Sequence, residues 1–385
     1  MRKLIFLVWV LLLPTSVSMA QSVVPLEAFA QKQKISLVRI SPNGEMIAFL
    51  RMQDGKPLVL VKRIDGPMIS GANLEGVKPS NIRWASNEYL LLTVSNTGYD
   101  IRFRAKHQRS EYYRTFSFHI KSKKIVQLLK YSSAKLSTYS INLGSIIAID
   151  HETPAAYIPA ANKDHELDVY KVDMKKGRGI VARKGVRSLR KWVMNSANQP
   201  VVRVYHFQEN GDFQIQVPDK KWWKTIYKKE SELPPFNVIG LNMDETALIV
   251  NTTTDAIPFE ALYEMDLETG EWGKPLFQAE GYDLGGSILD PYTNLVVGVS
   301  WVADQDEYHW FDPELAALYK ALKGALTGSA VRLTSWSKDR KKFILSIAKP
   351  GRQVKYGVYF VGTKELKIIA SARPILDTVV LGKVT

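Results

Sequence analysis

Six histidines and no cysteine limit the chemistry that this chain of 385 residues could perform. Without cysteine, the chain cannot form disulfides, iron–sulfur clusters or cysteine-based zinc sites, and it cannot use thiol catalysis. No two histidines stand at the i, i+4 or His-x-His spacing that zinc sites favour, so we predict no metal site. A P-loop, a Rossmann glycine fingerprint and an EF-hand loop are also missing, so we expect no cofactor. The histidines are His107, His119, His151, His165, His206 and His309.

The nearest approach to a catalytic serine motif is the run Gly285-Gly286-Ser287-Ile288-Leu289. A Gly-x-Ser-x-Gly elbow holds its serine on a tight turn between a strand and a helix. Leu289 stands where the second glycine must allow close packing, and the run lies in a β-rich stretch between two of the repeats described below. The sequence therefore predicts no catalytic residue.

The net charge is +14, from 52 lysines and arginines against 38 acidic residues. Several of the basic residues lie in one stretch that interrupts a predicted hairpin. The role of this stretch has two interpretations. The stretch is either a long solvated loop or a contact with an anionic envelope surface, such as polymers or lipid headgroups. Its basic residues are Arg102, Arg104, Lys106, His107, Arg109 and Arg114.

The elements that must carry these residues repeat along the chain. Short strand-like runs recur after similar openings, and the gaps between openings are 43, 64, 44, 49, 48 and 46 residues. A period of 40 to 50 residues with four short strands is typical of β-propeller blades, whose apolar faces are covered only when blades stack in a ring. Two β-sandwiches would have similar strand content but give no reason for repeated openings. The opening residues are Ser41, Trp84, Ala148, Trp192, Leu241, Leu289 and Ser335.

The sequence thus predicts an all-β fold, a seven-bladed β-propeller of four-stranded blades. Asn43-Gly44 in the first repeat predicts a type I′ hairpin turn. One short rim helix is expected near residues 313–324, because Asp312 is an N-cap residue, Pro313 suits the first helical position and apolar residues follow at helical spacing.

The N-terminus has the pattern of a secretory signal peptide. Arg2 and Lys3 precede ten apolar residues, and Ser18-Met19-Ala20 offers a cleavage site. Ten residues span about 15 Å as a helix, half of a bilayer core, so we expect no transmembrane anchor in the mature chain. We expect a periplasmic or secreted protein, cleaved near Ala20, and no nucleic-acid partner.

Several of these runs resemble one known family. Ile40-Ser41-Pro42-Asn43-Gly44, the openings at Trp84 and Trp192, and the strand 169–173 are similar to the propeller of the prolyl oligopeptidase family of serine peptidases. Residues 308–313 and the helix after them resemble its acylaminoacyl/dipeptidyl-peptidase branch. The resemblance covers roughly Pro25 to Leu376.

The predicted domain order is the signal peptide at 1–20, a propeller domain at 21–376 and a tail at 377–385, where the resemblance implies that a hydrolase domain would normally begin. The resemblance implies a substrate-gating domain that lacks the catalytic α/β-hydrolase domain and is inactive alone, with peptides or a separate hydrolase domain as partners. It also suggests a substrate-rim site for a peptide amino terminus at Asp304, Asp306 and Glu307, although no family motif matches there. The alternative hypothesis is a stand-alone periplasmic binding or scaffold propeller.

Overall fold

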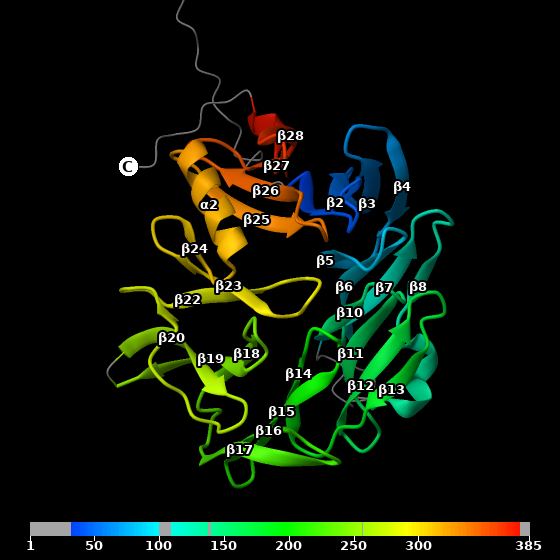
Figure 1. Ribbon diagram of the computed structural model, residues 1–385. Coiled ribbons are helices and arrows are strands. Elements are labelled where there is room, and N and C mark those ends of the chain that lie inside the picture. Colours follow the sequence, from blue (N-terminus) through cyan, green and yellow to red (C-terminus); the bar gives the residue numbers. More distant parts are fainter. Residues whose placement is uncertain (1–31, 100–108, 138–139, 256, 378–385) are drawn as a thin grey trace, which may run out of the picture.

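The strands of this chain form seven antiparallel sheets arranged in a ring, as Figure 1 shows. The computed structural model describes residues 32–99, 109–137, 140–255 and 257–377. Within each sheet the main strands are hydrogen-bonded in sequence order, so each sheet is one blade built from one continuous segment. The predicted seven-bladed β-propeller is therefore confirmed.

Blades 1 to 3 occupy the first half of the ring. Blade 1 contains β1 (Ile35–Ile40), β2 (Met46–Gln53), β3 (Lys56–Arg63) and β4 (Met68–Asn73). Blade 2 contains β5 (Lys78–Trp84), β6 (Tyr89–Tyr99), β7 (Arg109–His119) and β8 (Ile125–Gln127). Blade 3 contains β10 (Ala148–Asp150), β11 (Ala155–Ala161), β12 (Leu167–Asp173) and β13 (Gly179–Arg183).

Blades 4 to 7 complete the ring. Blade 4 contains β14 (Leu189–Met194), β15 (Pro200–Phe207), β16 (Asp212–Asp219) and β17 (Trp222–Glu230). Blade 5 contains β18 (Asn237–Leu241), β19 (Ala247–Thr254), β20 (Ile257–Asp266) and β21 (Phe277–Gln278). Blade 6 contains β22 (Leu284–Leu289), β23 (Val296–Val302) and β24 (Asp306–Trp310), and blade 7 contains β25 (Ala330–Trp336), β26 (Lys342–Ala348), β27 (Lys355–Phe360) and β28 (Glu365–Ser371).

Two blades depart from the predicted four strands. Blade 6 has three, and α2 (Pro313–Ala325) follows them before blade 7 begins. Blade 2 has a fifth strand, β9 (Asn142–Leu143), which pairs parallel to β7. The long β6–β7 hairpin, together with β9 and the 3-10 helix η1 (Lys130–Lys135), accounts for the one long gap of 64 residues between openings.

The rim helix begins as predicted. Asp312 Oδ1 accepts hydrogen bonds from the backbone amides of Glu314 at 3.0 Å and Leu315 at 3.1 Å. Leu315, Tyr319 and Leu322 form its buried stripe, which packs against blades 6 and 7. A second 3-10 helix, η2 (Pro374–Leu376), follows the last strand. No helix in the described part of the chain is long and apolar enough to cross a membrane.

The first turn of the ring corrects one prediction. Of Asn43 and Gly44 only the glycine has a positive φ, 69°, whereas a type I′ turn needs both. The amide of Gly44 donates to Ser41 O at 2.8 Å, and that of Ser41 to Met46 O at 2.8 Å, which closes a four-residue loop. The Ser41 hydroxyl also accepts from the Met46 amide at 2.9 Å. The polar residue after the strand therefore sets the turn.

Seven clusters of buried apolar residues hold the ring together, one at each interface between neighbouring blades. Blades 1 and 7 come from opposite ends of the chain and share no strand, so the ring is closed by packed side chains and a few backbone hydrogen bonds outside the strand pairs, such as the one from the Lys338 amide to Pro42 O at 2.8 Å. Val38 and Ile40 pack there against Ile344 and Val358. Because burial of apolar area is the main stabilising term, each blade depends on both neighbours.

The first strand of each blade lies nearest the centre of the ring and the last strand nearest its edge (Figure 1). Every predicted opening residue lies in or directly beside a first strand. Since neighbouring strands run antiparallel, all turns between first and second strands lie on one face of the ring, here called the turn face. These turns are residues 41–45, 85–88, 151–154, 195–199, 242–246, 290–295 and 337–341.

The opposite face, here called the end face, carries the first and last residues of the ring. The amide of Lys34, just before β1, donates to the carbonyl of Ala372, just after β28, at 2.7 Å. The ring strands run from Ile35 to Ser371, inside the predicted propeller boundaries of 21–376. The predicted signal peptide lies outside the described residues, as does nearly all of the predicted tail.

Candidate functional site

The hairpin between β23 and β24 carries the three acidic residues predicted to line a rim site, and it lies on the end face. Asp304 is in the turn, while Asp306 and Glu307 begin β24 and point to opposite sides of the sheet. The ammonium group of Lys323 in α2 pairs with Glu307, and Gln305 Nε2 donates to the same carboxylate at 3.3 Å. Asp304 and Asp306 are exposed. Only these two remain open at the rim, and capture of an amino terminus there stays a prediction.

The serine of the glycine-rich run lies in an ordinary strand. Ser287 is part of β22 and pairs with Val299 of β23. The sequence suggested that the run lies between two blades. This prediction was wrong, because the run forms the first strand of blade 6. A nucleophile elbow needs a sharp strand-to-helix turn, which this position lacks.

A serine, a histidine and a carboxylate do lie close together, where the turn after β7 meets the turn between β5 and β6. Ser122 Oγ lies 2.7 Å from His119 Nδ1, and His119 Nε2 lies 4.0 Å from Glu88 Oε2. Glu88 also accepts from Lys121 Nζ at 3.0 Å, and this hydrogen bond is the largest cause that lowers the pKa of Glu88. The amide of Ser122 also donates to His119 Nδ1, at 3.3 Å. The group is a solvent-exposed turn with its carboxylate engaged elsewhere, which is unsuited to nucleophilic catalysis.

Charge is distributed very unevenly along the seven first strands, which together form the inner wall of the ring. They carry six basic residues and a single acid, Asp150. Asp150 is paired with Lys171 Nζ at 2.8 Å, and although burial opposes it, this bond and those from Thr153 lower the pKa of Asp150 to about 2. The six basic residues are Arg39, Lys78, Arg83, Arg190, Lys191 and Arg332.

Three of these arginines lie on the first strands of the adjacent blades 7, 1 and 2, and the middle one, Arg39, interacts with the charges of the other two. Burial, together with the smaller effect of the positive charges of Arg332 and Arg83, lowers the pKa of Arg39 to about 10. Partial loss of hydration among the surrounding strands also lowers the pKa of Arg83, although the residue keeps water-accessible surface. Arg83 and Arg332 remain accessible to water although they lie on first strands, so solvent reaches the inner wall at this point. We call Arg39, Arg83 and Arg332 the inner-wall arginines.

Contacts on the turn face span the centre of the ring. His151 of blade 3 lies 3.0 Å from Ala85 O of blade 2 through Nδ1, and 3.1 Å from Pro291 O of blade 6 through Nε2. Lys338 of blade 7 pairs with Glu152 of blade 3 at 2.7 Å. Blades 3 and 6, and blades 3 and 7, are not neighbours in the ring. These bridges therefore narrow the centre at the turn face.

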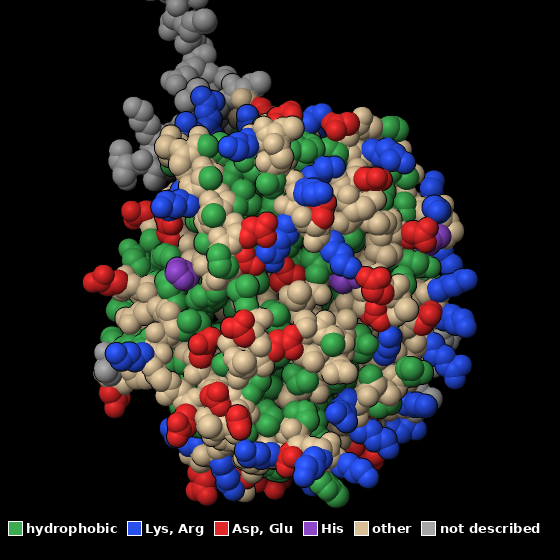
Figure 2. Space-filling view, viewed as in Figure 1, with side chains coloured by type: hydrophobic (Ala, Val, Ile, Leu, Met, Phe, Trp, Pro, Cys, Tyr) green, Lys and Arg blue, Asp and Glu red, His purple; other side chains and the backbone are tan. Residues whose placement is uncertain are grey.

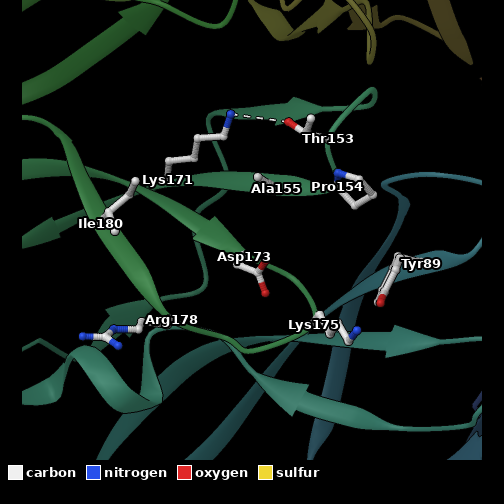
Figure 3. Close-up of a pocket in the computed structure, with 9 residues that line it drawn as sticks. All are labelled: Tyr89, Thr153, Pro154, Ala155, Lys171, Asp173, Lys175, Arg178 and Ile180. Atoms are coloured by element: carbon white, nitrogen blue, oxygen red, sulfur yellow. Dashed lines mark hydrogen bonds between the residues drawn. The ribbon is translucent and has the colours of Figure 1, made fainter.

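A groove lies on the outside of the ring between blades 2 and 3. Figure 3 shows that its side chains come from Tyr89, the 153–155 turn and strand, and β12 and β13, with Lys171 hydrogen-bonded to Thr153 at 3.5 Å. Lysines and arginines gather along this edge of the molecule in Figure 2. Of the predicted basic hairpin, residues 100–108 lie outside the described part, and Arg114 Nη1 donates to Ile141 O at 2.8 Å. A second hollow beside the groove shares Lys175 and Arg178 with it, and the basic residues that line the two together are Lys124, Lys130, Lys171, Lys175, Lys176 and Arg178.

Sequence reasoning missed the inner wall. A signal for it was present in the sequence, because Arg39 precedes Ser41 by two residues, and Arg83 and Lys191 directly precede the opening tryptophans Trp84 and Trp192.

No group of three or more histidines or acids in the described ranges could hold a metal ion.

Comparison with known proteins supports one family. The chain is 22% identical over 351 residues to dipeptidyl aminopeptidase BIII from Pseudoxanthomonas mexicana. The aligned residues cover 88% of this chain and 47% of that protein. The chain therefore spans about half the length of the curated relative that it matches. No protein-family model matches the chain.

Solved structures with the same fold include two that belong to peptidases. The β-propeller domain of the Trilobed protease from Pyrococcus furiosus superposes with a TM-score of 0.52 and 10% identity, covering 89% of this chain and 99% of that one. Oligopeptidase B from Leishmania major gives a TM-score of 0.51 and 9% identity, covering 90% of this chain and 50% of that one. This chain is thus a seven-bladed β-propeller similar to the propeller part of the prolyl oligopeptidase family of serine peptidases.

Proposed function

We propose that this propeller is the substrate-gating part of a peptidase of the prolyl oligopeptidase type. The observation that carries the proposal is that both ends of the ring lie on the end face. A catalytic module joined to either end would cover that face, with the Asp304–Asp306 hairpin at its rim. The bridges on the turn face narrow the other side, so peptides would enter between the ring and this module and reach the inner wall from the end face. The ring would select peptides and exclude water, and acyl transfer would require a hydrolase domain.

The purified chain is therefore expected to bind short peptides without cleaving them. Aminoacyl and peptidyl nitroanilides should show no turnover, because no position of this chain matches a catalytic residue of the family. Calorimetry with peptides of about six residues should show saturable binding. A folded protein with the same peptide embedded in a rigid element serves as the control and should not bind. Turnover abolished by a serine-directed phosphonate, or no peptide binding at all, would contradict the proposal.

The proposed location is the periplasm or the exterior of the cell. The sequence of residues 1–20 supports this proposal through its charged start, its apolar run and its small residues before Gln21. Expression of the full chain in a bacterial host should yield a mature protein that begins at Gln21, as determined by mass spectrometry. Leu11→Arg places a charge within the apolar run and should leave uncleaved protein in the cytoplasm. Cytoplasmic, uncleaved wild-type protein would exclude export.

A further inference from the structure

We propose that the inner-wall arginines Arg39, Arg83 and Arg332 form a binding site for the carboxylates of acidic peptides. This inference rests on the proposed function, which makes peptides the ligand class, and it adds a preference for negatively charged ones. The site lies on β1, β5 and β25, the first strands of three adjacent blades, and none of its residues belongs to the predicted rim.

The three guanidinium groups have no anionic partner within the described part of the chain. Arg39 Nη1 donates to Val38 O at 2.9 Å, and Arg83 Nη1 donates to Ile146 O at 3.2 Å. Both acceptors are neutral main-chain carbonyls. A guanidinium has five N–H donors in a rigid fork, so most of these donors remain available to a ligand.

Other basic residues of the inner wall are already engaged. Lys78 pairs with Glu111 at 3.1 Å, and Lys191 donates to the carbonyl of Val238. Arg190 Nε donates to the carbonyl of His206 at 3.3 Å. Of these three residues only Lys78 has an acidic partner. The inner-wall arginines differ from Lys191 and Arg190 because they lie on three adjacent first strands, where the charges of Arg332 and Arg83 act on Arg39.

Mutual repulsion makes this arrangement costly without an anion. Arg39 is half-buried, and its pKa falls first through burial and then through the charges of Arg332 and Arg83. Like charges held close together raise the free energy of the charged state, and an anion between them relieves that cost. Clusters of this kind, with perturbed pKa values and no structural counter-ion, are typical of ligand sites.

The chemistry of guanidinium groups favours carboxylates that can accept two parallel hydrogen bonds. A peptide that enters from the end face passes the rim before it meets the inner-wall arginines, and the bridges at His151 and Lys338 narrow the space beyond them. Glutamate or aspartate side chains, or the peptide's own carboxyl terminus, would supply the anion.

The test compares hexapeptides with a free amino terminus and an amidated carboxyl terminus that differ only in two central residues, either both glutamate, both glutamine or both lysine. Isothermal titration calorimetry should give on the order of tenfold tighter binding for the glutamate peptide than for the glutamine peptide, and the weakest binding for the lysine peptide. The preference should fall as salt rises from low to physiological concentrations, because screening weakens exposed charge interactions.

Two triple variants remove the same positive charge from different surfaces. Arg39→Gln/Arg83→Gln/Arg332→Gln should abolish the preference for glutamate while leaving the glutamine peptide bound as before. Lys175→Gln/Lys176→Gln/Arg178→Gln removes three charges from the outer groove and should keep the preference. If the first triple variant does not fold by circular dichroism, Arg83→Gln/Arg332→Gln changes only the two water-accessible members and should still reduce the preference several-fold.

Equal affinity for the glutamate and glutamine peptides would overturn the inference while leaving the proposed function intact. Loss of the preference in the outer-groove variant alone would also overturn it, because the anion would then bind outside the ring. Inorganic phosphate serves as a further probe. If it binds as tightly as the glutamate peptide, the site is a small-anion site and the peptide assignment is wrong.

Discussion

Replacing Arg340 with methionine is expected to destabilise the propeller by about 3 kcal/mol. Arg340 lies in the turn of blade 7, and its guanidinium donates to Asp290 at 3.0 Å, Asp312 at 2.7 Å and Glu314 at 3.1 Å. The Asp290 and Asp312 side chains are only 3% and 5% exposed. Although burial opposes the charge, the hydrogen bonds to Asp312, Asp290 and Glu314 raise the pKa of Arg340. Methionine keeps the apolar stem but leaves two buried carboxylates without a cation.

Urea denaturation at neutral pH measures the effect as a lower midpoint with an unchanged slope. Arg187→Met is the matched control, because its partner Glu209 lies 3.6 Å away and both side chains are more than 80% exposed. It should cost less than about 0.5 kcal/mol. Adding Asp290→Asn and Asp312→Asn to Arg340→Met should restore part of the loss, since the unpaired charges are removed. If Arg340→Met behaves like Arg187→Met, the cluster does not join blades 6 and 7 energetically.

Gly270→Ala is expected to destabilise the contact between blades 4 and 5 by roughly 2–4 kcal/mol. Gly270 follows β20 with a φ of 77°, and an added Cβ would lie 1.9 Å from the carbonyl oxygen of Ile226 in β17. The loop cannot easily move away. Asp266 Oδ1 accepts from the amides of Glu268 at 2.9 Å and Thr269 at 2.8 Å, and the Gly270 amide donates to Asp266 O at 2.9 Å.

Gly281→Ala separates the clash from the backbone strain. Gly281 has the same φ of 77°, but an added Cβ would meet nothing within 4 Å. This variant should lose only about 1 kcal/mol, the cost of a left-handed conformation for a residue with a side chain. Thermal or urea unfolding of the two variants gives the difference directly. Equal losses would mean that blades 4 and 5 separate at this point without cost.

Much of the fold could be predicted from repeated local chemistry. A polar residue ends the first strand of most blades and closes the following turn with its side chain, as Ser41, Asn242 and Ser337 do. This chemistry depends on neighbours in sequence, so it is visible without a structure. The N-cap of α2 is local in the same way, and the prediction at Asp312 was confirmed.

The structure differs from the predictions at positions where residues distant in sequence decide the local structure. Asn43-Gly44 predicts a type I′ turn by itself, but the hydrogen bonds of Ser41 lengthen the loop to four residues. Blade 6 has three strands instead of the predicted four, and α2 packs against it. Glu307, predicted to line the rim site, is paired with Lys323, which is 16 residues further on. These outcomes depend on contacts that form only when the elements meet.

By itself, the amino-acid sequence determined the number of blades, the places where they open and the helix after blade 6. Each of these rests on interactions within a few residues of one another. Only the tertiary structure decided which charges face one another. Arg39 and Arg332 are nearly 300 positions apart, and they interact because apolar packing of blade 7 against blade 1 closes the ring. Closure places the first strands together at the centre, and with them a concentration of positive charge that no local pattern reveals.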